Sequence, residues 1–168
     1  MEFKYRKRMR LTNYNYSQCG VYFITICSHN QNQIFSQLVG NGLDRSIFKL
    51  TQYGIIAENE LKNIEKHFPC VEIDKYVVMP NHIHIIILMR CNGELERSRP
   101  FPTISTIIGL YKSGVSKLIH EIDPNQNVWQ KSFHDHIIRN EKSYQKIWQY
   151  IDENPLKWKF DKYYCNEM

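Results

Sequence analysis

The chain has 168 residues, of which 42% are hydrophobic, and a formal net charge of +5. This length fits one domain, and the apolar fraction is enough to form a core. No apolar run approaches the roughly 18 residues of a membrane-spanning helix. The basic N-terminus lacks the apolar stretch of a secretory signal, so we expect a cytoplasmic protein without membrane contacts. The five cysteines form no Cys-x-x-Cys pair, and we expect them to be reduced.

Hydrophobic periodicity divides the chain into alternating strands and helices. In chain order, we expect a basic arm, a strand, a polar segment that can hold a hairpin, a helix, two strands joined by a tight turn, a helix, a strand, a helix and a basic, aromatic tail. The corresponding ranges are 1–18, 21–27, 30–44, 50–66, 71–79, 82–89, 103–119, 128–138, 143–153 and 156–168. Thr103 has the properties of a helix N-cap.

This order predicts an α+β fold with a ferredoxin-like β-α-β-β-α-β unit, an antiparallel sheet and an extra C-terminal helix. Residues 1–168 would form a single domain. The first and third strands are central in this topology. We expect the helices of the unit to cover one face of the sheet and to leave the other face open.

Two histidines lie on one face of the third strand, since His82 and His84 are two residues apart and side chains alternate along a strand. Ile83, Ile85 and Ile87 would then point into the core. Two imidazoles at this spacing form half of a site for a divalent metal. The alternative is a pair of hydrogen-bonded structural histidines.

A tyrosine on the next helix has the chemistry to act beside such a metal. A phenolate attacks a phosphodiester when a metal polarises the phosphoryl oxygens. Tyr111 is the candidate, and the adjacent Lys112 could neutralise phosphate charge. Tyr111 also falls on the apolar stripe of its helix, so a purely structural place in the core stays open.

Basic residues interleaved with aromatic ones favour nucleic-acid binding, since they combine phosphate contacts with base stacking. A solvated basic surface is the alternative. The candidate DNA contacts are Lys7, Arg8, Arg10, Lys112, Lys117, Arg139 and Lys157.

Several ordered segments together resemble the REP-associated tyrosine transposase group of the HUH endonuclease superfamily, close to single-tyrosine insertion-sequence transposases. The segments are 8–11, 14–16, 20–27, 79–84, 111–113, 128–130, 134–141 and 150–158. The resemblance implies that His82 and His84 hold Mg²⁺ or Mn²⁺ and that Tyr111 is the nucleophile. It also implies cleavage and rejoining of single-stranded DNA, typically at hairpins, through a 5′-phosphotyrosine intermediate.

The third metal ligand departs from the pattern of the related transposases. Those enzymes have a glutamine one helical turn after the tyrosine, where this chain has Val115. His134, Asp135 and His136 are the candidates, either as ligands or as DNA contacts; water and substrate phosphate are the alternative.

The sequence leaves open a hairpin-binding protein, for DNA or RNA, without catalytic activity. A phosphoesterase with two histidines as acid and base is a weaker third hypothesis. A monomer and a homodimer are both compatible with the chain, and the protein is expected to associate with the nucleoid.

Overall fold

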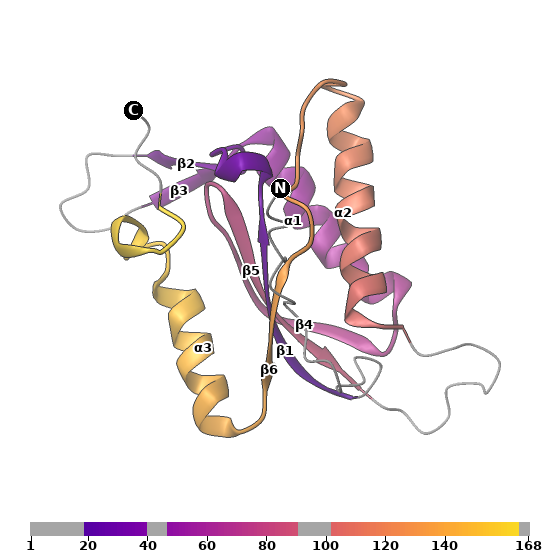
Figure 1. Ribbon diagram of the computed structural model, residues 1–168, viewed down its shortest axis with the longest axis vertical. Helices are drawn as coiled ribbons and strands as arrows, with labels where there is room; N and C mark the ends of the chain where they lie inside the picture. The colour runs from indigo at the N-terminus through magenta and orange to yellow at the C-terminus, as the bar shows by residue number, and fades with distance from the viewer. Residues whose placement is uncertain (1–18, 40–46, 91–101, 165–168) are drawn as a thin grey trace, which may run out of the picture.

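A four-stranded antiparallel sheet forms the centre of the protein, as seen in a computed structural model that describes residues 19–39, 47–90 and 102–164 (Figure 1). The strand order is β4-β5-β1-β6. The strands are β1 (Gly20–Cys27), β4 (Val71–Val78), β5 (His82–Met89) and β6 (His134–Ile138). β1 and β5 are therefore the central strands. The predicted ferredoxin-like α+β fold is confirmed.

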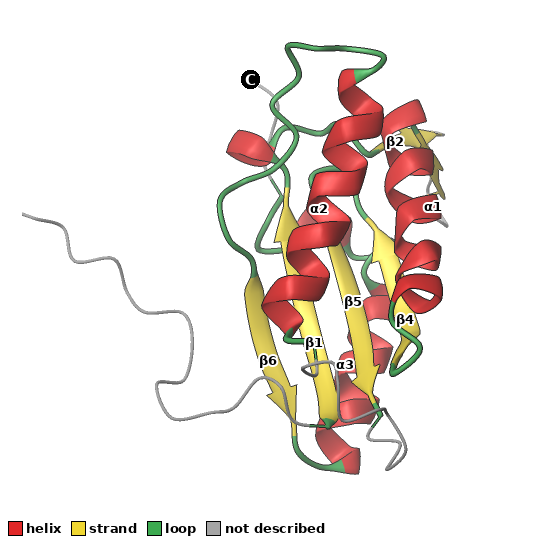
Figure 2. Ribbon diagram, turned by 90° about the vertical axis from the view of Figure 1, so that its right-hand side faces the viewer, coloured by secondary structure: helices red, strands yellow, loops and turns green. Residues whose placement is uncertain are grey.

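Two helices cover one face of this sheet, as Figure 2 shows. They are α1 (Gln52–His67) and α2 (Ile104–His120). Thr103 caps α2 as predicted, because its side chain accepts a hydrogen bond from the Thr106 amide. The main core lies between these helices and the sheet, and Ile83, Ile85 and Ile87 contribute to it with no exposed surface.

The third helix, α3 (Glu141–Glu153), packs on the opposite face of the sheet (Figure 1). Ile151 of α3 forms a second, smaller core there with Ile86 and Ile138 of the sheet. The expectation that this face is open was therefore wrong. A strand pattern does not reveal that a helix following the last strand folds back beneath the sheet.

Two further differences from the sequence prediction are local. The last strand begins at His134 rather than at residue 128, because Ser132 adopts a positive φ of 69° that interrupts the extended run. The segment at 30–44 contributes one strand of a separate antiparallel pair, β2 (Ser36–Val39) with β3 (Ile47–Leu50).

The remaining elements are two short 3₁₀ helices, η1 (His29–Gln31) and η2 (Trp158–Phe160). Cys27 and Cys70 are free and buried, whereas Cys19 is disulfide-bonded, contrary to the expectation of reduced cysteines. Among the described residues, no helix has the length and apolar character to cross a membrane. The predicted basic arm, 1–18, lies outside the described residues.

Candidate metal and tyrosine site

The histidine pair lies side by side on β5, on the face that α3 covers. His82 and His84 have no exposed surface, and their Nε2 atoms are 3.0 Å apart. The alternation along β5 that sends the isoleucines into the main core sends both imidazoles to the opposite face. The sequence prediction that they share a face is therefore confirmed.

Hydrogen bonds fix how the two rings are oriented. The Asn81 amide donates to the carbonyl oxygen of Tyr163 (2.7 Å), so its oxygen Oδ1 accepts from Nδ1 of His82 (2.9 Å). His82 in its neutral form therefore has its lone pair on Nε2. Thr25 Oγ1 lies 2.8 Å from Nδ1 of His84. Such partners behind a ring are how proteins hold a metal-binding histidine in the required tautomer.

A carboxylate completes the cluster from the segment after α3. Asp161 offers an oxygen that, with one nitrogen of each histidine, forms a group whose atoms all lie within 4.8 Å of one another. The segment is held in place because the Tyr163 amide donates to Asp161 Oδ1 (2.7 Å) and Asn154 Nδ2 donates to Oδ2 (2.7 Å). Two imidazoles and a carboxylate are a set of ligands that fits a divalent cation.

A tyrosine hydroxyl lies directly at this cluster. The Oη atom of Tyr150, on α3, is 3.2 Å from Nε2 of His84 and donates to Asp161 Oδ2 at 3.0 Å. Phe23 packs edge-on against the Tyr150 ring and also contacts the His84 ring. The tyrosine hydroxyl, the two imidazoles and the carboxylate are therefore linked by successive contacts of hydrogen-bond length.

Burial sets the protonation of the site. Loss of solvation lowers the pKa of His82 to about 4, although the Asp161 carboxylate acts in the opposite direction. Burial, together with His82, also places the pKa of His84 well below its usual value. Both rings are thus neutral near pH 7, the form that binds a metal. Burial and the adjacent Asp161 raise the pKa of Tyr150.

Tyr111 does not reach this site. Its side chain is buried in the main core on the other face of the sheet, where its hydroxyl donates to the carbonyl of Ala57 at 3.1 Å. Desolvation and Glu60 raise its pKa. The expectation that Tyr111 lies beside the histidines is corrected, because the helical stripe that carries it faces α1. Val115 is buried in the same core.

The three candidates for the third ligand lie on β6 and outside the cluster. His134 and His136 are exposed and pair in register with Thr25 and Phe23 of β1. Directly opposite residues share a face of the sheet, so these two histidines lie on the α3 face. Neither belongs to the group of ligand atoms within 4.8 Å of one another, which His82, His84 and Asp161 form among the described residues. Asp135 points to the opposite face.

The predicted DNA contacts differ in their surroundings. The Lys112 ammonium donates to the carbonyls of Gln130 and Ser132, so it holds the loop before β6 in place. Lys117 and Arg139 are exposed, and exposed Lys157 forms an ion pair with Glu153. The remaining three, Lys7, Arg8 and Arg10, lie outside the described residues.

Sequence reasoning missed two residues of the site, Tyr150 and Asp161. Tyr150 belongs to the segment 150–158 on which the family resemblance partly rests, and that membership was the available signal. Asp161 lies in the basic, aromatic tail at 156–168, and no spacing rule connects it to the strand that carries the histidines.

The fold and site together define a ferredoxin-like α+β protein in which a histidine pair, an aspartate and a tyrosine converge on one face of the sheet. The chain is 36% identical to an uncharacterized protein of Haemophilus influenzae, over 96% of this chain and 94% of that one. It is 27% identical to the REP-associated tyrosine transposase of Escherichia coli K12, over 84% of this chain and 70% of that one.

A solved structure with the same fold is that of a REP-associated tyrosine transposase bound to a REP hairpin. The TM-score is 0.57 at 23% identity, and the match covers 92% of this chain and 77% of that one. No family model matches the chain. The chain is thus similar in sequence to REP-associated tyrosine transposases and has the fold of one of them.

Proposed function

We propose that this protein is a metal-dependent endonuclease and strand transferase for single-stranded DNA, with Tyr150 as the nucleophile. His82, His84 and Asp161 would hold the divalent metal. The observation that carries the proposal is the position of the Tyr150 hydroxyl, 3.2 Å from His84 Nε2 and 3.0 Å from Asp161 Oδ2. Tyr150 takes the role that the sequence analysis gave to Tyr111, whose hydroxyl is buried on the opposite face.

DNA as the substrate is supported by the relatives and by charge. Relatives of this chain are named transposases, and the solved neighbour is bound to a REP hairpin. The chain carries a net charge of +5, which suits a polyanionic partner. Lys162 is close enough to the histidines to lower the pKa of both. We therefore propose hairpin DNA with an unpaired flank as the substrate.

In the proposed reaction, the Tyr150 oxygen attacks the phosphorus of the scissile phosphodiester and the bond to the 3′-oxygen breaks. The Tyr150 proton passes to water and the departing 3′-oxygen takes a proton from water, while Asp161 orients the hydroxyl through the hydrogen bond that it accepts. The products are a 5′-phosphotyrosine and a free 3′-OH. When bound, the metal would polarise the phosphoryl oxygens. Attack by a 3′-OH on the phosphotyrosine reverses the step and joins strands.

The neutral imidazoles have a separate part in this scheme. With Nδ1 of His82 donating to Asn81, Nε2 presents a lone pair to a cation. Thr25 gives His84 a corresponding partner behind the ring. Asn81 and Thr25 thus orient the imidazole rings of His82 and His84. Phe23 contacts the rings of His84 and Tyr150.

The decisive experiment is a search for a covalent adduct. The protein is incubated with Mn²⁺ and labelled hairpin DNA with single-stranded flanks, and denaturing gels are followed by mass spectrometry of the linked peptide. We expect the phosphate on Tyr150, and no adduct with His82→Ala or in EDTA. Hairpin binding without an adduct under any metal would contradict catalysis and favour the binding protein. Cleavage without a covalent link would favour the acid–base phosphoesterase.

A further inference from the structure

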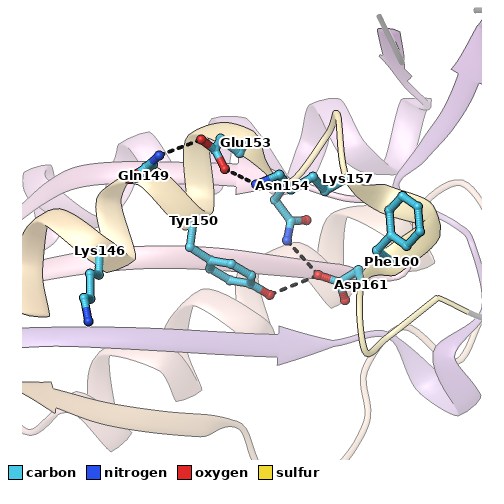
Figure 3. Close-up of a pocket in the computed structure, with 8 residues that line it drawn as sticks. All are labelled: Lys146, Gln149, Tyr150, Glu153, Asn154, Lys157, Phe160 and Asp161. Carbon is cyan, nitrogen blue, oxygen red and sulfur yellow. Dashed lines mark hydrogen bonds and ion pairs between the residues drawn. The ribbon is translucent and has the colours of Figure 1, made fainter. Parts of the chain in front are cut away.

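We propose that a cavity beside Tyr150 binds one unpaired DNA base, next to the phosphate that Tyr150 attacks. This inference rests on the proposed function and adds a base-binding subsite to it. The cavity has a volume of about 360 Å³, at the small end of the range of ligand pockets, roughly 300–1,000 Å³. Eight residues from α3 and the following segment line it (Figure 3): Lys146, Gln149, Tyr150, Glu153, Asn154, Lys157, Phe160 and Asp161.

The charges of the lining favour a base over a phosphate. Two lysines are balanced by two carboxylates, and one pair is already joined, since Lys157 forms an ion pair with Glu153. Gln149 Nε2 also donates to Glu153, at 2.7 Å. A site for a phosphate group would carry a net positive charge. A balanced set of amide and carboxylate groups instead matches the donors and acceptors on the edge of a nucleobase.

An unsatisfied acceptor points to the kind of base. Asn154 is 2% exposed, and its Nδ2 donates to Asp161. Its Oδ1 is buried and has no hydrogen-bond partner among the described residues. A buried acceptor without a partner costs about 1–3 kcal/mol, so a native site that retains one has a use for it. Once the Asn154 side chain turns this oxygen toward the cavity that it lines, the exocyclic amino group of adenine, cytosine or guanine would satisfy it, whereas thymine has no such group.

An exposed aromatic residue of the lining offers a surface for stacking. Phe160 is 90% exposed, an unusual position for a phenylalanine, and it lies on η2 one residue before Asp161. Proteins that bind single strands use exposed aromatic rings of this kind to stack on bases. A base held between Phe160 and the amides would place its own phosphate toward Tyr150 and Asp161, the two residues shared by the cavity and the site.

The test measures binding by the whole protein in EDTA, where metal-dependent cleavage does not occur. The probe is a fluorescent DNA hairpin with oligodeoxyadenosine flanks, in which each flank nucleotide in turn is made abasic or is replaced by thymidine. We expect one position at which loss of the base weakens binding roughly 5- to 150-fold. Thymidine there should also bind more weakly than adenosine. In Phe160→Leu, binding should be weaker and no longer depend on that base.

The matched control is Trp148→Leu, which removes an exposed aromatic ring of α3 that does not line the cavity. It should retain the dependence on the base. The proposal is overturned if no flank position is sensitive, if Phe160→Leu keeps the full sensitivity, or if Trp148→Leu removes it equally. It is also overturned if Lys146→Gln lowers the salt dependence of binding while Phe160→Leu has no effect, which would indicate a phosphate contact. Failure of adduct formation leaves these binding results unaffected.

Discussion

The two faces of the central sheet use the same strand for opposite purposes. Ile83, Ile85 and Ile87 of β5 pack under α1 and α2 in the main core, while His82 and His84 face α3. The alternation of side chains along one strand thus separates the residues that stabilise the protein from those that form its site.

Each face also holds a tyrosine whose pKa is raised, mainly by burial. Tyr111 donates to a backbone carbonyl of α1, whereas Tyr150 is bonded to His84 and Asp161. A raised pKa therefore does not identify a nucleophile. The groups that the hydroxyl contacts distinguish a core phenol from one placed beside candidate metal ligands.

The largest expected effect is the difference between the two tyrosines. Tyr150→Phe should lower the rate of adduct formation by on the order of 10³-fold or more, because it removes the proposed nucleophile. Tyr111→Phe should leave an adduct at Tyr150, since its hydroxyl lies on the other face. Gel assays of both variants, with thermal melts to verify folding, measure the difference. The reverse pattern would return the role to Tyr111.

Substitutions of two adjacent isoleucines, both fully buried, can be used to compare the packing on the two faces of the sheet. Ile85→Ala leaves a cavity in the main core and should lower the free energy of unfolding by about 2–5 kcal/mol. Ile86→Ala affects the smaller cluster under α3, where fewer buried groups surround it, and should cost less. Urea unfolding of both variants gives the two values. Equal losses would show that α3 packs as firmly as α1 and α2.

The hydrogen bond behind His82 should matter more for the metal than for folding. Asn81→Ala removes the acceptor of the His82 Nδ1 proton and should weaken Mn²⁺ binding about 10- to 100-fold. Titration calorimetry measures the affinity. Ser36→Ala, another buried polar position whose hydroxyl contacts the carbonyl of Val78, is the control and should bind Mn²⁺ normally. Equal losses in the two variants would remove the special role of Asn81.

The last effect concerns pH and only the face that carries the two histidines. Since burial lowers the pKa of His82 to about 4, the unfolded chain binds a proton between about pH 6.5 and pH 4 that the native protein does not. The free energy of unfolding of metal-free protein should therefore fall as the pH falls through this window, by at most about 1.4 kcal/mol per pH unit for this histidine.

Urea unfolding in EDTA, compared with His82→Asn, measures this contribution together with the effect of His82 on the pKa of His84, because the remaining titrating groups are common to both proteins. The wild-type protein should lose stability relative to the variant as the pH is lowered. A difference between them that is independent of pH would contradict the depressed pKa.

Much of the fold follows from local patterns. Periodicity gave the order of strands and helices, and an N-cap residue gave the start of α2 at Ile104. Hydrophobic periodicity did not predict where the backbone leaves a regular strand or where a helix packs on the sheet. The positive φ of Ser132 shortens β6, and the location of α3 depends on contacts with strands remote in sequence.

The sequence predicted only the part of the site that depends on residues close together in the chain. The spacing of His82 and His84 places them on one face without any knowledge of the rest of the fold. The choice between tyrosines is not local, since Tyr111 and Tyr150 both lie on helices and only the packing of α2 and α3 on opposite faces separates them. The apolar stripe around Tyr111 correctly indicated a core residue. Asp161 reaches the histidines through a tail that no periodicity describes.

The order of these residues along the chain has a consequence for synthesis. The ribosome completes all four strands of the central sheet, and both histidines, before it adds the carboxylate at Asp161. At about 5–20 residues per second, the interval between His84 and Asp161 is on the order of ten seconds. A nascent chain therefore carries an incomplete ligand set during that time. On the proposed mechanism, a product of premature termination before Asp161 would be unable to cut DNA.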